Sequence, residues 1–130
     1  MDDCLFCKII KGDIPSYKVY EDNDVLVFLD INPSTNGDSL IIPKNHFTTI
    51  EDIDLNTLNK LEMVKKIIYQ KAKEKLNCKG LTFAQNNGLG QEIKHFHIHA
   101  TPRYDNDLIE HHFNKEAVKP LEETFDILTK

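Results

Sequence analysis

The chain has 130 residues, of which 40% are hydrophobic and 28% charged, and its formal net charge is −5 at pH 7. This is the composition of one ordinary globular domain, and no apolar run approaches the roughly 20 residues that a membrane-spanning helix needs. The acidic balance and the single arginine, Arg103, exclude the basic stripe of a duplex-binding protein. The first residues are acidic where a signal peptide would be basic, so we expect a cytoplasmic protein that binds neither membranes nor long nucleic acid.

The predicted elements are short and are separated by loops rich in Asn, Asp, Gly and Pro. In chain order they are a helical segment at 4–12, strands at 18–21, 25–31 and 39–43, a long helix at 55–76, strands at 81–84 and 93–104, and a possible terminal helix at 120–128. Apolar residues at spacings of three and four indicate the long helix, with Asp54 as its N-cap.

Neighbouring strands joined by short loops predict an antiparallel sheet. The expected fold class is therefore α+β, with a five-stranded antiparallel sheet, one long helix and a short N-terminal helix. Residues 1–104 would form the domain, and residues 105–130 would form a C-terminal tail that belongs to the same domain.

Three of the six histidines, His95, His97 and His99, alternate with apolar residues. Such alternation is typical of a half-buried strand, which places all three imidazoles on one face. A strand rises roughly 3.3 Å per residue, so successive imidazoles are expected about 6.6 Å apart. A single metal ion, with nitrogen ligands at about 2.0 Å, could hardly bind all three.

The central histidine, His97, is a candidate nucleophile. A neutral imidazole nitrogen can attack phosphorus when the other ring nitrogen keeps its proton on an acceptor such as a backbone carbonyl. His99, on the same face, could donate to phosphate oxygens as they gain charge. The alternative is a row of ordinary structural histidines, but burying three titratable rings without a task costs desolvation at each of them.

The chain resembles the histidine triad (HIT) superfamily of nucleotide hydrolases and transferases, in particular its Hint-like branch with an N-terminal CxxC. The resemblance covers about residues 4–104. Besides the histidine row it rests on Ile14-Pro15, Phe28-Leu29-Asp30-Ile31, Leu40 to Lys44, His46, Asn86, Gly90-Gln91 and Pro102-Arg103, in the family's order.

The resemblance implies a role for each matching residue. His97 would be the nucleophile, and His99 and Gln91 would contact the α-phosphate or the leaving-group oxygen. Asn86 would bind phosphate, and Asp30 would accept hydrogen bonds from the ribose hydroxyls. The purine pocket would be lined by Phe6, Ile9, Ile14, Phe28 and Ile31, although ordinary core packing remains open for Phe28 and Ile31.

Cys4 and Cys7 have the CxxC spacing of half a tetrahedral zinc site. His46 and His95 are the candidates for the other two ligands, and the resemblance supports this quartet as a closed structural zinc site. A redox pair and free thiols are the alternatives, although no βαβ pattern follows the motif. Cys78 is expected to be a packed thiol, and His111 and His112 a solvated pair.

The expected reaction is attack of His97 on the α-phosphate of a purine nucleotide conjugate, followed by hydrolysis of the nucleotidyl-histidine. Phosphoramidates are the first substrate class and dinucleoside polyphosphates the second. Asp38 and Glu92 replace a histidine and a serine that are frequent in the family, so a nucleotide-binding or scaffold protein with little turnover is the alternative. A metal-dependent hydrolase is a third possibility. By resemblance we expect a homodimer with a ten-stranded sheet.

Overall fold

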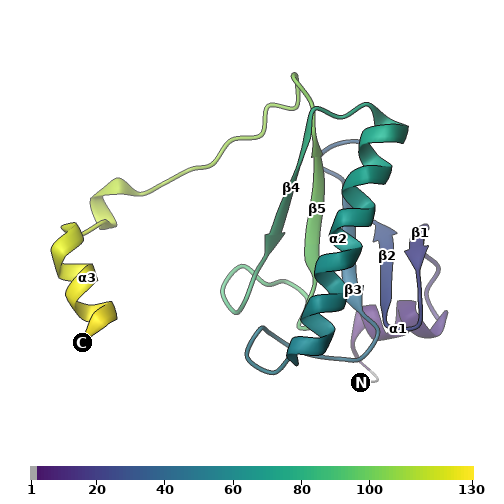
Figure 1. The fold of residues 1–130 in the computed structure, drawn as a ribbon, viewed down its shortest axis with the longest axis horizontal. Coiled ribbons are helices and arrows are strands. Elements are labelled where there is room, and N and C mark those ends of the chain that lie inside the picture. Colours follow the sequence, from purple (N-terminus) through teal and green to yellow (C-terminus); the bar gives the residue numbers. More distant parts are fainter. Residues whose placement is uncertain (1–2) are drawn as a thin grey trace.

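The computed structural model describes residues 3–130 and places five strands in one antiparallel sheet of order β1-β2-β3-β5-β4 (Figure 1). Its elements are α1 (Leu5–Lys11), β1 (Lys18–Glu21), β2 (Val25–Leu29), β3 (Ser39–Pro43), α2 (Leu55–Leu76), β4 (Gly80–Gln85), β5 (Ile98–Arg103), a 3-10 turn η1 (Lys115–Ala117) and α3 (Leu121–Thr129). The predicted α+β fold class, with one long helix and a short N-terminal helix, is confirmed.

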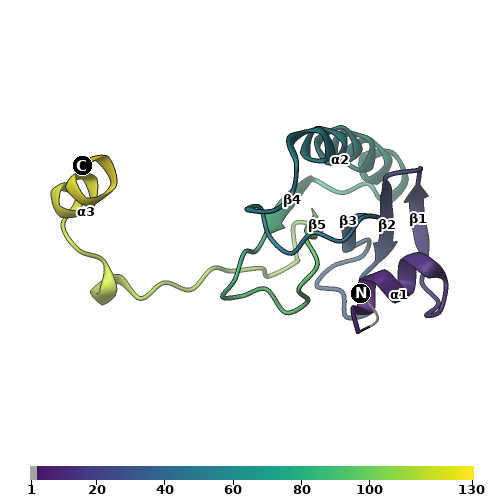
Figure 2. The same cartoon turned by 90° about the horizontal axis from the view of Figure 1, so that it is seen from below.

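The two helices α1 and α2 cover opposite faces of the sheet (Figure 2). Val25 and Val27 of β2 pack with α2, whereas Leu26 and Phe28 pack with α1. Because β2 is buried on both faces, its sequence is continuously apolar and does not alternate between apolar and polar residues. Seven-residue α1 covers only part of its face, and the rest of that face is available for a site.

The N-cap predicted for the long helix is present. The side chain of Asp54 accepts from the backbone N–H of Thr57 at 3.2 Å, which satisfies a free donor in the first turn. At the other end Asn77 takes the left-handed conformation, with φ of 54°, and ends α2 after Leu76. Buried Leu61, Val64 and Ile68 then face the sheet.

Two strands are shorter than predicted. β2 ends at Leu29 instead of residue 31, and β5 begins at Ile98 instead of residue 93. β3 pairs with β5 only from Ile98 to Ala100, and β4 ends at Gln85, the partner of Ile98. The carbonyl oxygen of Pro43, at the end of β3, accepts from Nε2 of His95 instead of from the backbone before β5. The N–H of Phe96 therefore donates to Phe47 in the loop after β3. His95 and His97 consequently precede the ladder instead of lying within it.

Beyond β5 the chain is fixed by an ion pair and then leaves the sheet. Asp107 accepts from Arg103 Nε at 2.7 Å and from the N–H groups of Tyr104 and Ile109. From residue 110 onward every residue is exposed, and the segment with α3 projects away from the sheet in both views (Figures 1 and 2).

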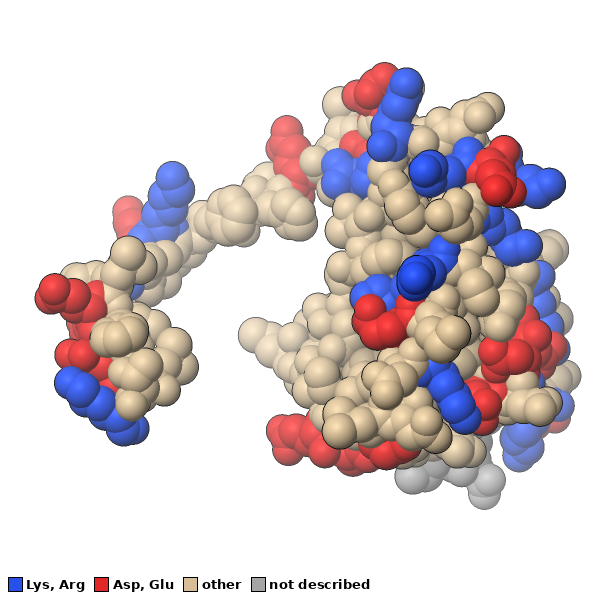
Figure 3. All heavy atoms as spheres, viewed as in Figure 1, with Lys and Arg blue, Asp and Glu red and all other residues tan. Residues whose placement is uncertain are grey.

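Charged side chains of both signs are interspersed over the face seen in Figure 3, without a continuous basic stripe there. Among residues 3–130, no helix is long and apolar enough to cross a membrane.

Candidate active site and metal centre

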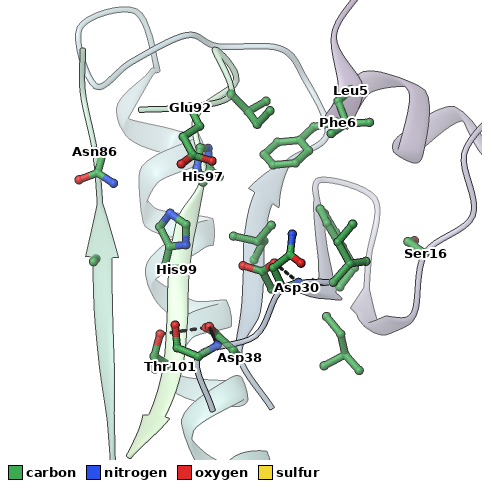
Figure 4. Close-up of a pocket in the computed structure, with 18 of the residues that line it drawn as sticks. Leu5, Phe6, Ser16, Asp30, Asp38, Asn86, Glu92, His97, His99 and Thr101 are labelled. Carbon is green, nitrogen blue, oxygen red and sulfur yellow. Dashed lines mark hydrogen bonds between the residues drawn. The ribbon is translucent and has the colours of Figure 1, made fainter. Parts of the chain in front are cut away.

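The part of the sheet that α1 leaves uncovered forms the floor of a cavity of about 830 Å³. β5 contributes His99 and Thr101 to the lining, with His97 just before the strand (Figure 4). Asn86 follows β4 on one side, and Asp30 follows β2 on the other. Residues far apart in sequence are thus brought together by the antiparallel order of the strands.

His97 is held in one tautomer by the backbone. Its Nδ1 lies 2.7 Å from the carbonyl oxygen of His95, and since a carbonyl can only accept, Nδ1 carries the proton. The other ring nitrogen, Nε2, therefore has a free lone pair. His97 is buried, and its ring centroid lies 5.0 Å from that of half-buried His99. This is the arrangement that the sequence predicts for a nucleophilic imidazole.

The environment keeps His97 neutral. Burial lowers its pKa below the ordinary histidine value, and the neighbouring His99 acts in the same direction. The hydrogen bond to His95 and the negative charges of Asp30 and Glu92 oppose this shift without cancelling it. A neutral imidazole is the form that can act as a nucleophile.

One end of the cavity is apolar. Phe6 and Phe28 meet there at a centroid distance of 5.5 Å, and the lining also includes Ile9, Ile14 and Ile31. The sequence left open whether Phe28 and Ile31 are core or pocket; Phe28 is buried in the core beside the cavity, whereas Ile31 is 85% exposed at the rim. Asp30 stands next to this end, with Oδ1 accepting from the N–H of Asn32 at 2.9 Å.

The two predicted phosphate contacts differ in their placement. Asn86 lines the cavity, on a loop where Gly88 and Gly90 have positive φ. Gln91 is buried, and its amide is engaged by the backbone: Nε2 donates to Thr48 O at 2.7 Å and Oε1 accepts from the N–H of Gly88. The Gln91 side chain braces the loop and is not part of the cavity lining.

Of the two acidic residues that replace residues frequent in the family, Asp38 has a structural role. Asp38 is buried and accepts from the N–H of Ser34 and from Oγ1 of Thr101, each at 2.9 Å, so its carboxylate ties the turn before β3 to β5. Glu92 lines the cavity beside His97 instead of pointing away (Figure 4). Nζ of the nearby Lys94 donates to the carbonyl oxygen of Gln91 instead of pairing with Glu92.

Several lining residues were not predicted from the sequence, among them Thr101, Ile109 and His111. Thr101 continues the histidine alternation by one step, and that periodicity was the available signal. Ile109 and His111 reach the rim because the pairing of Arg103 with Asp107 directs the chain across it. His111 and His112 are exposed, as expected.

Cys4, Cys7, His46 and His95 form a second cluster, whose ligand atoms all lie within 4.8 Å of one another. Cys4 Sγ is 3.5 Å from Nδ1 of His95, and Cys7 Sγ is 3.4 Å from Nδ1 of His46 and 3.6 Å from Nδ1 of His95. A tetrahedron with Zn–S of about 2.3 Å and Zn–N of about 2.05 Å has S···N edges of about 3.5 Å. The spacing of these donors fits zinc.

The protonation of the cluster also fits a cation. Nε2 of His95 donates to the carbonyl oxygen of Pro43 at 2.8 Å, which turns a lone pair on Nδ1 toward the cysteines. Burial lowers the pKa of His95 to about 4, so the ring is neutral. Burial and the adjacent Cys4 raise the pKa of the Cys7 thiol. A divalent cation would reverse this effect and favour both thiolates.

Comparison with known proteins identifies the family. A family model for the HIT domain matches residues 11–106. The chain belongs to the HIT family. It is 44% identical over 107 residues to a HIT-like protein from Methanocaldococcus jannaschii, covering 80% of this chain and 81% of the relative. It is 39% identical over 103 residues to adenosine 5'-monophosphoramidase from Schizosaccharomyces pombe, covering 77% and 74%.

Solved structures of HIT proteins have the same fold. A HIT family protein from Bacillus anthracis is 36% identical, with a TM-score of 0.85 over 98% of this chain and 94% of that one. A zinc-bound histidine triad family protein from Mycobacterium smegmatis is 34% identical, with a TM-score of 0.80 over 87% and 84%. Zinc is thus found in one protein of this fold, and the two cysteines and two histidines of the Cys/His cluster are compatible with zinc as well.

Proposed function

We propose that this HIT protein hydrolyses purine nucleotide conjugates at the α-phosphate, with His97 as the nucleophile. The observation that carries the proposal is the hydrogen bond from Nδ1 of His97 to the carbonyl oxygen of His95, which leaves a lone pair on Nε2 of a neutral ring in the cavity. Nucleoside phosphoramidates are the first substrate class, since the Schizosaccharomyces pombe relative is an adenosine 5'-monophosphoramidase. Dinucleoside polyphosphates are the second.

The reaction has two steps. Nε2 of His97 forms a bond to the α-phosphorus while the bond from phosphorus to the leaving nitrogen breaks, and that nitrogen takes up a proton. Water then attacks the nucleotidyl-histidine, which releases AMP and a proton and restores the neutral ring. His99, half-buried beside His97, donates to the phosphate oxygens as they gain charge.

The rest of the cavity would orient the nucleotide. Its apolar end, with Phe6 and Phe28 in edge contact, suits a purine base. The Asp30 carboxylate stands beside that end and would accept from the ribose hydroxyls. Asn86 would donate to the phosphate from the opposite side. Gln91 would reach it only after giving up its bonds to Gly88 and Thr48, so its role here is to position the loop.

The Cys/His cluster would hold a structural zinc ion. With four protein ligands, zinc would cross-link α1 to the segment before β5 and leave no position open for a substrate. The triad histidines do not converge on a shared ion, because His95 turns toward the cysteines while His97 and His99 line the cavity. This separation supports a metal-free reaction centre over a metal-dependent hydrolase that uses the triad as ligands.

An assay with adenosine 5'-phosphoramidate tests the proposal. His97→Ala should lower kcat/KM by at least about a thousandfold, the scale of losing a nucleophile. His112→Ala is the matched control, because His112 is exposed and does not line the cavity. Equal rates for wild type and His97→Ala would refute the nucleophile.

A second candidate is a nucleotide-binding protein with little turnover. It is favoured by the side chain of Gln91, which is committed to the backbone instead of the cavity. This candidate predicts that AMP binds while neither wild type nor His97→Ala hydrolyses any conjugate. Calorimetry with AMP alongside the rate assay separates the two candidates.

The sheet leaves an edge for a second copy. Among the strands of residues 3–130, β4 pairs with β5 alone, and the neighbouring α2 exposes Met63 and Ile67. An open edge strand beside exposed apolar residues suits pairing with another chain. We therefore propose a homodimer in which two sheets join into ten strands. Light scattering at micromolar concentration should give twice 15.0 kDa, and the mass of one chain would contradict the dimer.

A further inference from the structure

The cavity is acidic for a site that would bind a nucleotide. Three carboxylates line it, on Asp30, Asp38 and Glu92, and Arg103 is the one lysine or arginine in the lining of the described chain. Arg103 is already engaged, with Nε 2.7 Å and Nη2 3.3 Å from the two oxygens of Asp107. Any phosphate beyond the α-phosphate would therefore find no free side-chain cation there.

Glu92 differs from the other two carboxylates in its bonding. Asp38 is buried and spends both oxygens on Ser34 and Thr101, and Asp30 accepts from the backbone of Asn32. Glu92 is exposed, and within residues 3–130 it forms no ion pair. Its carboxylate lies next to His97 in Figure 4. It is thus an uncompensated negative charge beside the proposed nucleophile.

We propose that Glu92 makes this site select conjugates whose leaving group is neutral or cationic, such as an amine, over conjugates whose leaving group carries further negative charge. The inference rests on the proposed function and sharpens it, because it places phosphoramidates of cationic amines above dinucleoside polyphosphates. The Glu92 carboxylate discriminates between leaving groups of different charge. The nucleotide part is the same in all the conjugates compared. Discrimination by an uncompensated charge of this kind is a repulsive element of specificity.

The expected size of the effect follows from Coulomb's law. A unit charge on the leaving group about 8 Å from Glu92, at an effective dielectric between about 40 and 80, changes kcat/KM by roughly two- to sixfold. Opposite charges move it in opposite directions. The ratio between a cationic and an anionic conjugate should therefore contain a contribution from Glu92 of about tenfold. Because Glu92 is exposed, salt should reduce this contribution.

Three adenosine 5'-phosphoramidates of similar length provide the test: those of 1,4-diaminobutane, butylamine and 4-aminobutanoate. We expect kcat/KM to fall in that order for the wild-type protein. Glu92→Gln should reduce the ratio of the first to the last by about tenfold, and this ratio cancels any general effect on the rate. Glu74→Gln is the matched control, because it removes the same charge from exposed α2 outside the cavity.

The same series is measured by calorimetry in a His97→Asn background, with and without Glu92→Gln. This experiment tests, without turnover, whether the dissociation constants of the three conjugates follow the charge of the leaving group. A wild type that hydrolyses none of the conjugates would refute the proposed function, whereas an order of dissociation constants that depends on Glu92 would still support this inference. An unchanged ratio in Glu92→Gln, equal affinities for the three conjugates, or no binding of any of them would overturn it.

Discussion

The ring of Phe6 stands edge-on to the imidazole of His97, with centroids 5.1 Å apart and planes at 89°. The same phenyl ring also meets His95, at 5.8 Å. Phe6 lies between Cys4 and Cys7 at the start of α1, so the Cys/His cluster and the proposed nucleophile share one buried side chain. The N-terminal segment thereby acts as one wall of the cavity, and its attachment to the sheet determines how His97 is packed.

Zinc should be bound at about one ion per chain, and Cys7→Ala should abolish this binding. Because the ion would join α1 to the segment before β5, we also expect a lower Tm, by several degrees or more. Elemental analysis and thermal unfolding measure both effects. Cys78→Ala is the control, since Cys78 lies outside the cluster. Metal-free wild-type protein with the same Tm would contradict the structural role.

Phe6→Leu should weaken both packing and activity. Phe6 is only 3% exposed, and shortening it is expected to lower the free energy of unfolding by about 1–2 kcal/mol. Loss of the edge contact should also let the His97 ring move, which lowers kcat by roughly tenfold. Phe83→Leu makes the same change on the α2 face of the sheet and should affect stability alone. Equal kcat values for the two variants would contradict this link.

Sequence reasoning succeeded where a local pattern determines the structure. The spacing of apolar residues predicted α2 from Leu55 to Leu76 and its Asp54 cap, and both are confirmed. The short loop between the strands predicted at 18–21 and 25–31 indicated an antiparallel pair, and β1 and β2 form it. The Cys4 and Cys7 spacing, together with the family resemblance, indicated the quartet that the structure brings together.

Sequence reasoning failed where a tertiary contact determines the length of a strand or the position of a side chain. Alternation through His95 suggested one continuous strand from residue 93, but the pairing with both neighbouring strands stops at Ile98, the partner of Ile41 in β3 and of Gln85 in β4. Nothing local shows that the Gln91 amide is taken by Thr48, 43 residues earlier in the chain. The rim position of His111 likewise depends on the turn fixed by Asp107, which only the folded chain reveals.

Substitution of Asp30 should affect substrate binding, whereas substitution of Asp38 should affect stability. Asp38→Asn replaces one acceptor with a donor opposite the N–H of Ser34 or the hydroxyl of Thr101, so it should cost about 1–3 kcal/mol in the free energy of unfolding. Asp30→Asn should leave stability nearly unchanged and raise KM for a ribonucleotide conjugate by roughly tenfold. The 2',3'-dideoxy conjugate is the control. A KM increase of the same size for that compound would exclude recognition of the ribose hydroxyls.

The Arg103–Asp107 pair should make stability depend on pH. The Arg103 guanidinium and two backbone N–H groups hold the pKa of Asp107 well below its usual range. The pKa of Asp107 is therefore lower in the folded chain than its unfolded value of about 3.9. Ionised Asp107 stabilises the folded protein above about pH 3.9, and this stabilisation is lost as the pH falls below that value toward the folded-state pKa. Asp107→Asn should therefore lower Tm at pH 7, with a difference from wild type that narrows toward pH 2. A constant difference over this range would argue against the ion pair as its cause.

The proposed reaction depends on covalent nucleotidylation of His97. Wild-type protein mixed with an adenosine 5'-phosphoramidate and quenched within milliseconds to seconds should show an intact-mass increase equal to one adenylyl group, which peptide mapping assigns to His97. The adduct should be absent from His97→Ala and should accumulate in any variant that slows hydrolysis more than transfer. Turnover of the substrate with no adduct at any time, or an adduct on another residue, would contradict the account.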